Sequence, residues 1–253
     1  MSSTPKTTVE RVMHHIVRRC LTVARVADIT PRMRRVTFTG EALQGFVSAA
    51  ADDHIKLLFA RNEEEQRRLD DFLAGREGER PVMRDYTPRR HDAQRGELDV
   101  DFVLHGDGPA ATWASQAQQG QQLYIAGPRS SLVVPDIFDA YLLIGDETAL
   151  PAIGRWLEEL APGRTATVLI EIDNEAEKQQ LSSAASVDLH WLIRGDRSLV
   201  DVTSDLAKPE GELYAWVACE ANQSRKVRRV LIERHGIDEE RIKAAGYWRR
   251  DDD

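Results

Sequence analysis

The chain has 253 residues, which is more than one ordinary hydrophobic core requires and suggests two domains. Its 42% hydrophobic and 30% charged residues are typical of soluble globular proteins, and they exclude a disordered chain, a collagen-like repeat and a disulfide-stapled miniprotein. The two cysteines, Cys20 and Cys219, are too few for a zinc or iron–sulfur site held by thiolates.

The expected location follows from hydropathy and cysteine content. No run of about 18 apolar residues occurs, so we expect no membrane insertion. The first ten residues are polar and lack the apolar segment of a secretory signal. Together with the low cysteine content, these features predict a cytoplasmic protein in a reducing compartment.

The net charge of −8 hides an uneven distribution. Residues 1–40 contain eight lysines and arginines against two acidic residues, for a net charge of +6, whereas the rest of the chain sums to −14. An acidic body disfavours nucleic acid and anionic membranes as partners. The basic first segment either serves an anionic ligand or is the charged edge of a sheet, which is the more common arrangement.

Residues 1–136 have the pattern of a β-rich domain. Short runs rich in β-branched residues are separated by Gly and Pro, as in a small closed antiparallel barrel. The predicted strands are 21–29, 33–39, 54–59, 98–104 and 123–126. A charged insertion at 62–80 contains one or two helical turns, and 109–118 is a helix that begins with Pro109.

Residues 137–253 alternate strands with helices, which predicts a doubly wound parallel sheet. The predicted strands are 141–145, 165–172, 187–193 and 213–219, and the predicted helices are 150–160 and 225–234. A barrel followed by such a domain suggests a flavin in the barrel and a nicotinamide nucleotide on the α/β domain. A fold by itself does not establish that function, so the site residues must support it.

The hexapeptide Arg-Asp-Tyr-Thr-Pro-Arg at residues 84–89 is the most informative segment. A flavin needs a flat partner for its ring and a cation for its pyrophosphate. Arg84 and Tyr86 stand two apart on a strand, so they point to the same face and offer these two groups. Thr87 points the other way and contributes through its backbone or where Pro88 ends the strand. An ordinary edge strand that carries a tyrosine explains the hexapeptide equally well.

Several further segments occur in an order that resembles the siderophore-interacting protein family. These are flavin-dependent ferric-siderophore reductases related to ferredoxin–NADP reductases. The matching segments are residues 53–59, 84–89, 101–105, 108–114, 127–131, 145–151 and 246–248. Several uncommon segments in one order are more specific than any of them alone, and they span nearly the whole chain.

The resemblance implies a set of contacts to FAD. Arg84 binds the FAD diphosphate, Tyr86 lies along the flavin and its ribityl chain, and Thr87 approaches the ring. The turn and helix start at residues 108–113 also hold the diphosphate. His105, just before this turn, either contacts the phosphate or is a structural histidine.

Residue sizes in the 108–113 segment agree with a bound anion. Gly108 and Ala111 are small enough for a phosphate to approach the backbone N–H groups of a helix N-terminus, and Thr112 adds a hydroxyl donor. Trp113 either contacts the cofactor or belongs to the core, which is where tryptophan is more often found.

Gly145, Thr148 and Ala149 lie between an apolar strand and a helix, where doubly wound domains bind nucleotides. A G-x-G-x-x-G pattern is absent, and it is the resemblance that assigns contact with the nicotinamide nucleotide to these three residues. Asp146 and Glu147 are expected to face ribose, nicotinamide or solvent, because a carboxylate beside a phosphate is unfavourable.

Use of NADPH requires a cation for the 2′-phosphate. Arg194 and Arg197 stand after a predicted strand where NADP-dependent relatives place such a charge. Second candidates, at the start of the next predicted helix, are Arg225 and Lys226. Glu171 and Asp173 instead suit the ribose diol of NADH. On these grounds we expect NADPH, with NADH as the alternative.

Ferric catecholate and hydroxycarboxylate chelates are often anionic, so a locally cationic site is expected for the substrate. Lys56 and Arg129, both in segments that match the family, are the leading candidates for substrate binding, ahead of Arg249 and Arg250. A solvated surface charge is the alternative for each. Related reductases end with an aromatic residue that stacks on the flavin, but residues follow Trp248 here, which leaves its contact with the flavin open.

The leading hypothesis is a cytosolic, FAD-bound ferric-siderophore reductase that draws electrons from NADPH or NADH and releases Fe(II). Electrons pass through FAD, because hydride carries two electrons and Fe(III) accepts one, so no catalytic acid, base or protein-bound metal is expected. The alternatives are a general flavin-linked reductase with a protein or quinone acceptor, and a ferric-chelate binding module reduced externally. No nucleic-acid motif accompanies the basic first segment, so we expect no nucleic-acid partner.

Overall fold

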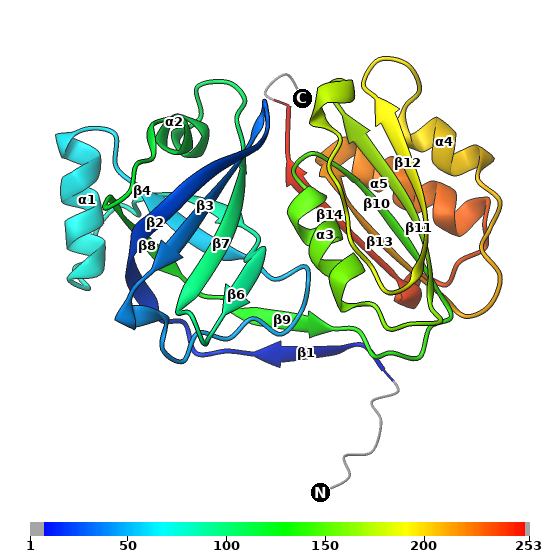
Figure 1. Cartoon of the computed structure of the whole chain (residues 1–253), viewed down its shortest axis with the longest axis horizontal. Helices are drawn as coiled ribbons and strands as arrows, with labels where there is room; N and C mark the ends of the chain where they lie inside the picture. Colours follow the sequence, from blue (N-terminus) through cyan, green and yellow to red (C-terminus); the bar gives the residue numbers. More distant parts are fainter. Residues whose placement is uncertain (1–7, 251–253) are drawn as a thin grey trace, which may run out of the picture. The chain divides into compact units, whose positions relative to one another are not determined.

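The structure, a computed structural model, describes residues 8–250. The chain forms two compact units, one from Val9 to Val134 and one that begins at Pro135 (Figure 1). Within the described residues, no helix is both long and apolar enough to cross a membrane. Each unit has its own core and is described separately.

The first unit is an antiparallel sheet that curls into a barrel-like domain. Its strands are β2 Arg18–Thr30, β3 Met33–Thr39, β4 Ile55–Phe59, β5 Val82–Tyr86, β6 Arg90–Asp92, β7 Glu97–Val103 and β8 Gln122–Ala126. They are ordered β5-β4-β8-β2-β3-β7-β6, so β5 and β6 are edges and the expected closure of the barrel is not made by hydrogen bonds between these two strands. A separate antiparallel pair joins β1 Glu10–Met13 to β9 Ser130–Val133.

Alternation along the strands builds the core of this unit. In β7, Leu98, Val100 and Phe102 are fully buried on one face and pack against Phe38 of β3 and its neighbours. Helix α2, Pro109–Gln116, adds Ala110 and Ala114 to the same core. The core therefore holds α2 and the inner strands in fixed positions.

The charged insertion forms α1, Glu63–Leu73, whose 11 residues make it longer than the one or two turns that the sequence suggested. Asn62 caps the helix by accepting the N–H of Glu65 (2.9 Å), and three glutamates in the first turn favour the positive end of the helix dipole. Leu69 is buried. Local capping and charge explain why this polar segment still forms three turns.

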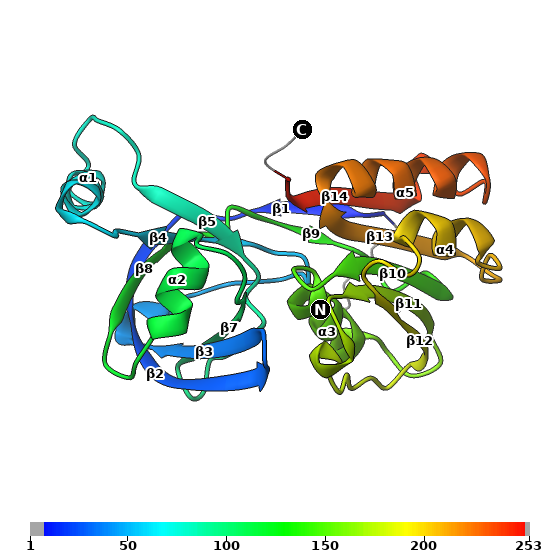
Figure 2. The same ribbon diagram turned by 90° about the horizontal axis from the view of Figure 1, so that it is seen from above.

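The second unit is a five-stranded parallel sheet. Its strands are β10 Ala140–Asp146, β11 Thr165–Ile172, β12 Ser186–Ile193, β13 Leu213–Glu220 and β14 Ile242–Trp248. The order β12-β11-β10-β13-β14 reverses direction between β10 and β13. Its helices are α3 Leu150–Glu159, α4 Leu199–Asp205 and α5 Ala221–Glu233. Figure 2 shows α3 on one face of the sheet and α4 with α5 on the other, which confirms the predicted doubly wound fold.

Short 3-10 helices complete the two units: η1 Glu41–Leu43, η2 Glu175–Glu177 and η3 Glu239–Arg241. All seven residues of β10 are buried, as expected for the central strand of a sheet covered on both faces. This strand leads directly into the turn before α3.

Gly145, near the end of β10, is required by packing. A Cβ atom at this position would lie 2.8 Å from the backbone oxygen of Ala218 and would overlap the Cβ of Ala149. We predict that Gly145→Ala lowers the free energy of unfolding by about 1–3 kcal/mol, the usual cost of overpacking. Urea denaturation of the purified protein measures this change.

The matched control is Gly78→Ala, because a Cβ at Gly78 has no atom within 4 Å. This exposed substitution should change the unfolding free energy by no more than about 0.5 kcal/mol. If both substitutions changed the unfolding free energy equally, close packing against Ala149 and Ala218 would not be the reason for a glycine at position 145.

Candidate functional site

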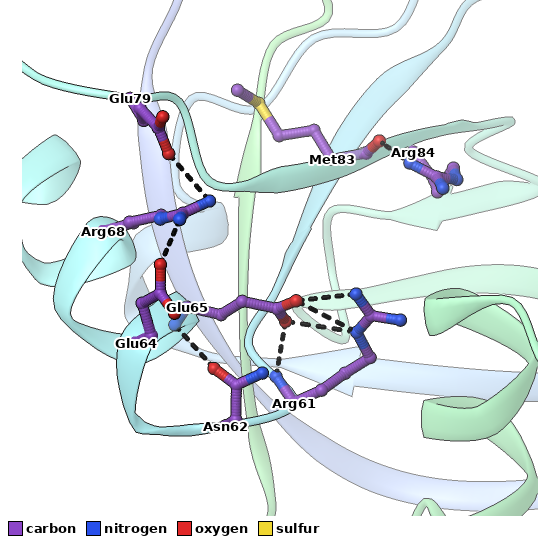
Figure 3. Close-up of polar contacts among 8 residues, drawn as sticks. All are labelled: Arg61, Asn62, Glu64, Glu65, Arg68, Glu79, Met83 and Arg84. Carbon is purple, nitrogen blue, oxygen red and sulfur yellow. Dashed lines mark hydrogen bonds and ion pairs between the residues drawn. The ribbon is translucent and has the colours of Figure 1, made fainter.

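Arg84 lies on the edge strand β5, and its side chain is exposed. Its guanidinium Nη1 donates to the backbone oxygen of Met83 (2.9 Å) and forms no ion pair with a carboxylate of the described chain. Figure 3 shows this guanidinium apart from the ion pairs of α1, in which Arg61 bonds to Glu65. Arg84 therefore keeps its charge available for an anionic ligand.

Tyr86 is packed at the edge of the barrel core. Its ring lies 4.6 Å from that of Phe102, measured between centroids. Burial raises the pKa of Tyr86 to about 12, so the phenol stays protonated at neutral pH. Thr87, which follows, is 6% exposed. The strand thus presents a fixed aromatic ring two residues from an exposed guanidinium.

The N-terminus of α2, like that of α3, is not capped by a side chain. Gly108 precedes it without a side-chain cap, and no acidic residue lies in its first turn. The N–H groups of Ala110 and Ala111 have no acceptor within the helix, as in the first turn of any helix. By contrast, α1, α4 and α5 are each capped by a side chain of their own. An anion can therefore be accommodated at α2.

His105 and Trp113, on either side of this turn, differ in their surroundings. His105 is exposed and makes no side-chain hydrogen bond within the described residues, so nothing there gives it a structural role. Trp113 is partly buried and packs against the core, with its ring centroid 5.7 Å from that of Phe102 and 6.0 Å from that of Phe38. Its position needs no cofactor to explain it. Thr112, which is also partly buried, lies near the start of the same helix.

Lys56 lies on β4 directly opposite Asp85 of β5, and their side chains form an ion pair of 2.8 Å with both groups about half exposed. The other neighbour of Lys56 across the sheet is Ala126, the last residue of β8. Arg129 follows three residues later, is exposed, and forms no ion pair within the described chain. The register therefore brings Lys56 and the segment that carries Arg129 to the same end of β4.

In the second unit, the turn after β10 is tied together by Asp146, which is 1% exposed. Its Oδ1 accepts the N–H (3.0 Å) and the hydroxyl (2.5 Å) of Thr148. Its Oδ2 accepts the indole N–H of Trp248 (2.7 Å), which ends β14. Asp146 therefore does not face solvent, and the sequence contains no pattern from which its contact with Trp248 could be found.

Arg194 is surrounded by carboxylates. Its guanidinium pairs with Glu147 (2.5 Å), Glu171 (3.1 Å) and Asp173 (3.9 Å). Burial acts to lower the pKa of Arg194, but the bonds to Glu147 and Glu171 outweigh it and the pKa is raised. The cation predicted for a 2′-phosphate is thus already compensated by the chain itself.

The other candidate cations of this unit are placed differently from the expectation. Helix α5 begins at Ala221, so Arg225 and Lys226 lie in its second turn and the prediction that they start the helix is wrong. The carboxylate of Glu220 caps α5 through the N–H groups of Asn222 and Gln223, which explains the earlier start. Arg197 is exposed and pairs with Asp205 at 2.6 Å.

The buried carboxyl of Asp146 predicts a pH-dependent stability. Burial raises its pKa above the ordinary value of 3.8, against the hydrogen bonds from Thr148 and Trp248. The folded state therefore binds the proton more tightly than the unfolded state. The stability that this group contributes is complete below the unfolded pKa and falls as the pH rises toward the folded pKa.

We predict that Asp146→Asn, which cannot titrate, gains stability relative to the wild type between pH 4 and pH 7 because it avoids this loss. Urea unfolding of both proteins at the two pH values measures the difference between their free energies of unfolding. The other titratable groups are the same in both proteins, so their contributions cancel in this difference. A difference that does not change with pH would contradict a raised pKa at Asp146.

The barrel-like unit followed by a doubly wound unit has the fold of ferredoxin–NADP reductase-like flavoproteins. Residues 22–132 match the family model of a siderophore-interacting FAD-binding domain, and residues 138–251 match that of siderophore-interacting proteins. The chain belongs to the siderophore-interacting protein family.

Individual relatives cover nearly the whole chain. It is 34% identical to the NADPH-dependent ferric-chelate reductase of Escherichia coli, over 98% of this chain and 99% of that protein. It is 33% identical to the ferric vibriobactin reductase ViuB of Vibrio cholerae, over 92% and 89%. A siderophore utilization protein from T. fusca has a similar structure, with a TM-score of 0.83 and 33% identity over 96% of this chain and 98% of that one.

Proposed function

We propose that this protein is an FAD-dependent reductase that passes electrons from NAD(P)H to Fe(III) held in a siderophore. The observation that carries the proposal is the match over almost the full length to relatives named as ferric-chelate and ferric vibriobactin reductases. We place the reaction in the cytosol, where the two cysteines, both free in the structure, stay reduced.

The residues of the first unit fit FAD. An acid-free, uncapped helix N-terminus at Gly108 and an unpaired guanidinium at Arg84 are the two groups that bind a diphosphate. Tyr86 offers an aromatic surface whose phenol stays neutral, and Thr87 follows it at the end of the strand. When bound, FAD links a two-electron donor to a one-electron acceptor, so that one NAD(P)H reduces two Fe(III) to Fe(II).

In this proposal Lys56 and Arg129 bind the anionic chelate. The Lys56–Asp85 pair is an exposed ion pair, which contributes only about 0–1 kcal/mol, so the ammonium can exchange Asp85 for a ligand at little cost. Arg129 lies in the segment that follows the β8 residue next to Lys56. Their role is to hold the chelate by charge, and neither has to transfer a proton.

The nucleotide is proposed to bind at the carboxyl edge of the parallel sheet, beside Gly145, Thr148 and Ala149, as in other doubly wound domains. The hydrogen bonds of Thr148 to Asp146 leave this turn better suited to ribose or nicotinamide than to a phosphate. The preference for NADPH assumed that Arg194 is available for a 2′-phosphate, and its three carboxylate partners remove that support.

An anaerobic experiment separates the two half-reactions. NAD(P)H should bleach the flavin absorbance, and a ferric siderophore added with an Fe(II) trap should restore it with formation of trapped Fe(II). Lys56→Ala and Arg129→Ala should each raise KM for an anionic chelate on the order of tenfold, since a charge-assisted hydrogen bond is worth about 1.5–3 kcal/mol. Flavin reduction by NAD(P)H should be unchanged.

Arg95→Ala is the matched control, because Arg95 is an exposed arginine between β6 and β7, at the other edge of the same sheet. Equal loss in both half-reactions would refute a substrate role for Lys56 and Arg129. Flavin reduction without Fe(II) from any chelate would favour a protein or quinone acceptor, and no flavin reduction would favour an externally reduced binding module.

A second prediction tests the flavin site. A Cβ atom added at Gly108 would have no atom within 4 Å, and the residue has an ordinary φ of −63°, so a side chain fits there. Gly108→Asp places a carboxylate at the N-terminus of α2 and should weaken FAD binding about 5- to 30-fold relative to Gly108→Asn, which caps the helix without a charge. Fluorescence titration of the apoprotein with FAD measures both.

Both substitutions should leave the apoprotein at least as stable as the wild type, because each supplies a cap that Gly108 lacks. Thermal unfolding of the apoproteins is therefore the control for folding. Identical FAD affinities of the Asp and Asn variants would place the diphosphate away from this helix.

A further inference from the structure

The carboxyl edge of the parallel sheet is where the strand order reverses, between β10 and β13, and doubly wound domains bind their ligands there. Acidic residues lie at the ends of three adjacent strands at this edge. Asp146 ends β10 and Glu147 follows it, Glu171 is the last residue but one of β11, and Glu220 ends β13. All four are less than 10% exposed.

Three groups at this edge that could bind an additional phosphate, namely Arg194, the N-terminus of α5 and the turn before α3, are already occupied by carboxylates of the chain. The guanidinium of Arg194 holds Glu147 and Glu171. The N-terminus of α5 holds Glu220, whose Oε2 accepts two backbone N–H groups at 2.8 and 2.9 Å. The turn before α3 holds Asp146.

These carboxylates are held by donors of the chain itself. Burial alone would raise the pKa of Glu220, but the N–H groups of Asn222 and Gln223 hold it below its ordinary value. Glu147 and Glu171 each bond to Arg194, and Asp173 lies 3.9 Å from it. Three carboxylates therefore share one guanidinium, and this cluster has a formal excess of negative charge.

We propose that Glu147, Glu171 and Asp173 make this domain select NADH over NADPH, by repelling a 2′-phosphate and by accepting a hydrogen bond from a free ribose hydroxyl. The inference rests on the proposed function and specifies its electron donor. The pyrophosphate is common to both coenzymes and does not enter the comparison. A 2′-phosphate adds a charge of about −1.5 to −2 next to the cluster.

Glu171 has the main part in this selection. It lies near the end of the strand that follows the first strand and helix of the domain, the position from which an acidic residue bonds a ribose hydroxyl in NAD-binding domains. Its Oε1 accepts from Arg194 and its Oε2 from the amide of Gln223 (3.2 Å), so both oxygens are held in place. Carboxylates have room for further donors, since each oxygen has two lone pairs.

The direct test compares the binding of 5′-AMP and 2′,5′-ADP, which differ only in the 2′-phosphate, to the FAD-loaded protein by calorimetry. The wild type should bind 5′-AMP on the order of tenfold more tightly than 2′,5′-ADP, because the 2′-phosphate of 2′,5′-ADP is brought next to the carboxylates. Stopped-flow bleaching of the flavin should likewise be more efficient with NADH than with NADPH.

Glu171→Gln should shift the ratio of the two affinities toward 2′,5′-ADP on the order of tenfold, since it removes one repelling charge and frees one bond of Arg194. Asp173→Asn should shift the ratio in the same direction and provides a second test at a half-buried position, where a folding defect is less of a concern. Asp188→Asn is the control, because Asp188 is an exposed residue near the start of β12 and pairs with His190.

Tighter binding of 2′,5′-ADP by the wild type would overturn the inference, as would weaker binding of 2′,5′-ADP by Glu171→Gln, which would make Glu171 a support for a phosphate-binding Arg194. Absence of binding by either probe would overturn it too. If neither NADH nor NADPH bleaches the flavin, the proposed function fails while the affinity ratio still decides the selectivity, so the two failures are distinguishable.

Discussion

A guanidinium or a helix N-terminus binds a phosphate only when no carboxylate of the same chain already occupies it. In the first unit this condition is met: Arg84 forms no ion pair with a described carboxylate, and α2 has neither a side-chain cap nor an acid in its first turn. In the second unit Arg194 and the N-terminus of α5 are both occupied. Arg84 and the N-terminus of α2 can therefore bind a phosphate, whereas Arg194 and the N-terminus of α5 are blocked by carboxylates.

The scaffold determines which of these groups meet. Antiparallel register places Lys56 opposite Asp85 on one side and Ala126 on the other, so that strand pairing brings Lys56 next to the strand end from which the segment with Arg129 continues. In the parallel sheet, the carboxyl ends of all strands lie at one edge. There Glu147, after β10, and Glu171, in β11, form ion pairs with Arg194, after β12. The close approach of Ala149 and Ala218 to Gly145 holds the turn of that edge in place.

Much of the fold was predictable because the strands have strong local patterns. Residues 33–39 and 165–172 form strands with the predicted bounds, since both are rich in β-branched residues and end at turns. The strand β14 was not predicted, because its segment Ile242–Trp248 contains Lys, Ala and Gly and becomes a strand by pairing with β13. Helix α4 was also missed, although Ser198 and Asp201 form a capping box that marks its start.

The sequence by itself determined the two-domain order, the family resemblance and the set of candidate cations, because these depend on residue identity and on patterns of a few residues. Only the tertiary structure decided which cations are available. Arg194 meets Glu171 and Glu147 across 23 and 47 residues, and Asp146 meets Trp248 across 102. Coulomb energies and hydrogen bonds depend on distances in space, and chain folding sets those distances.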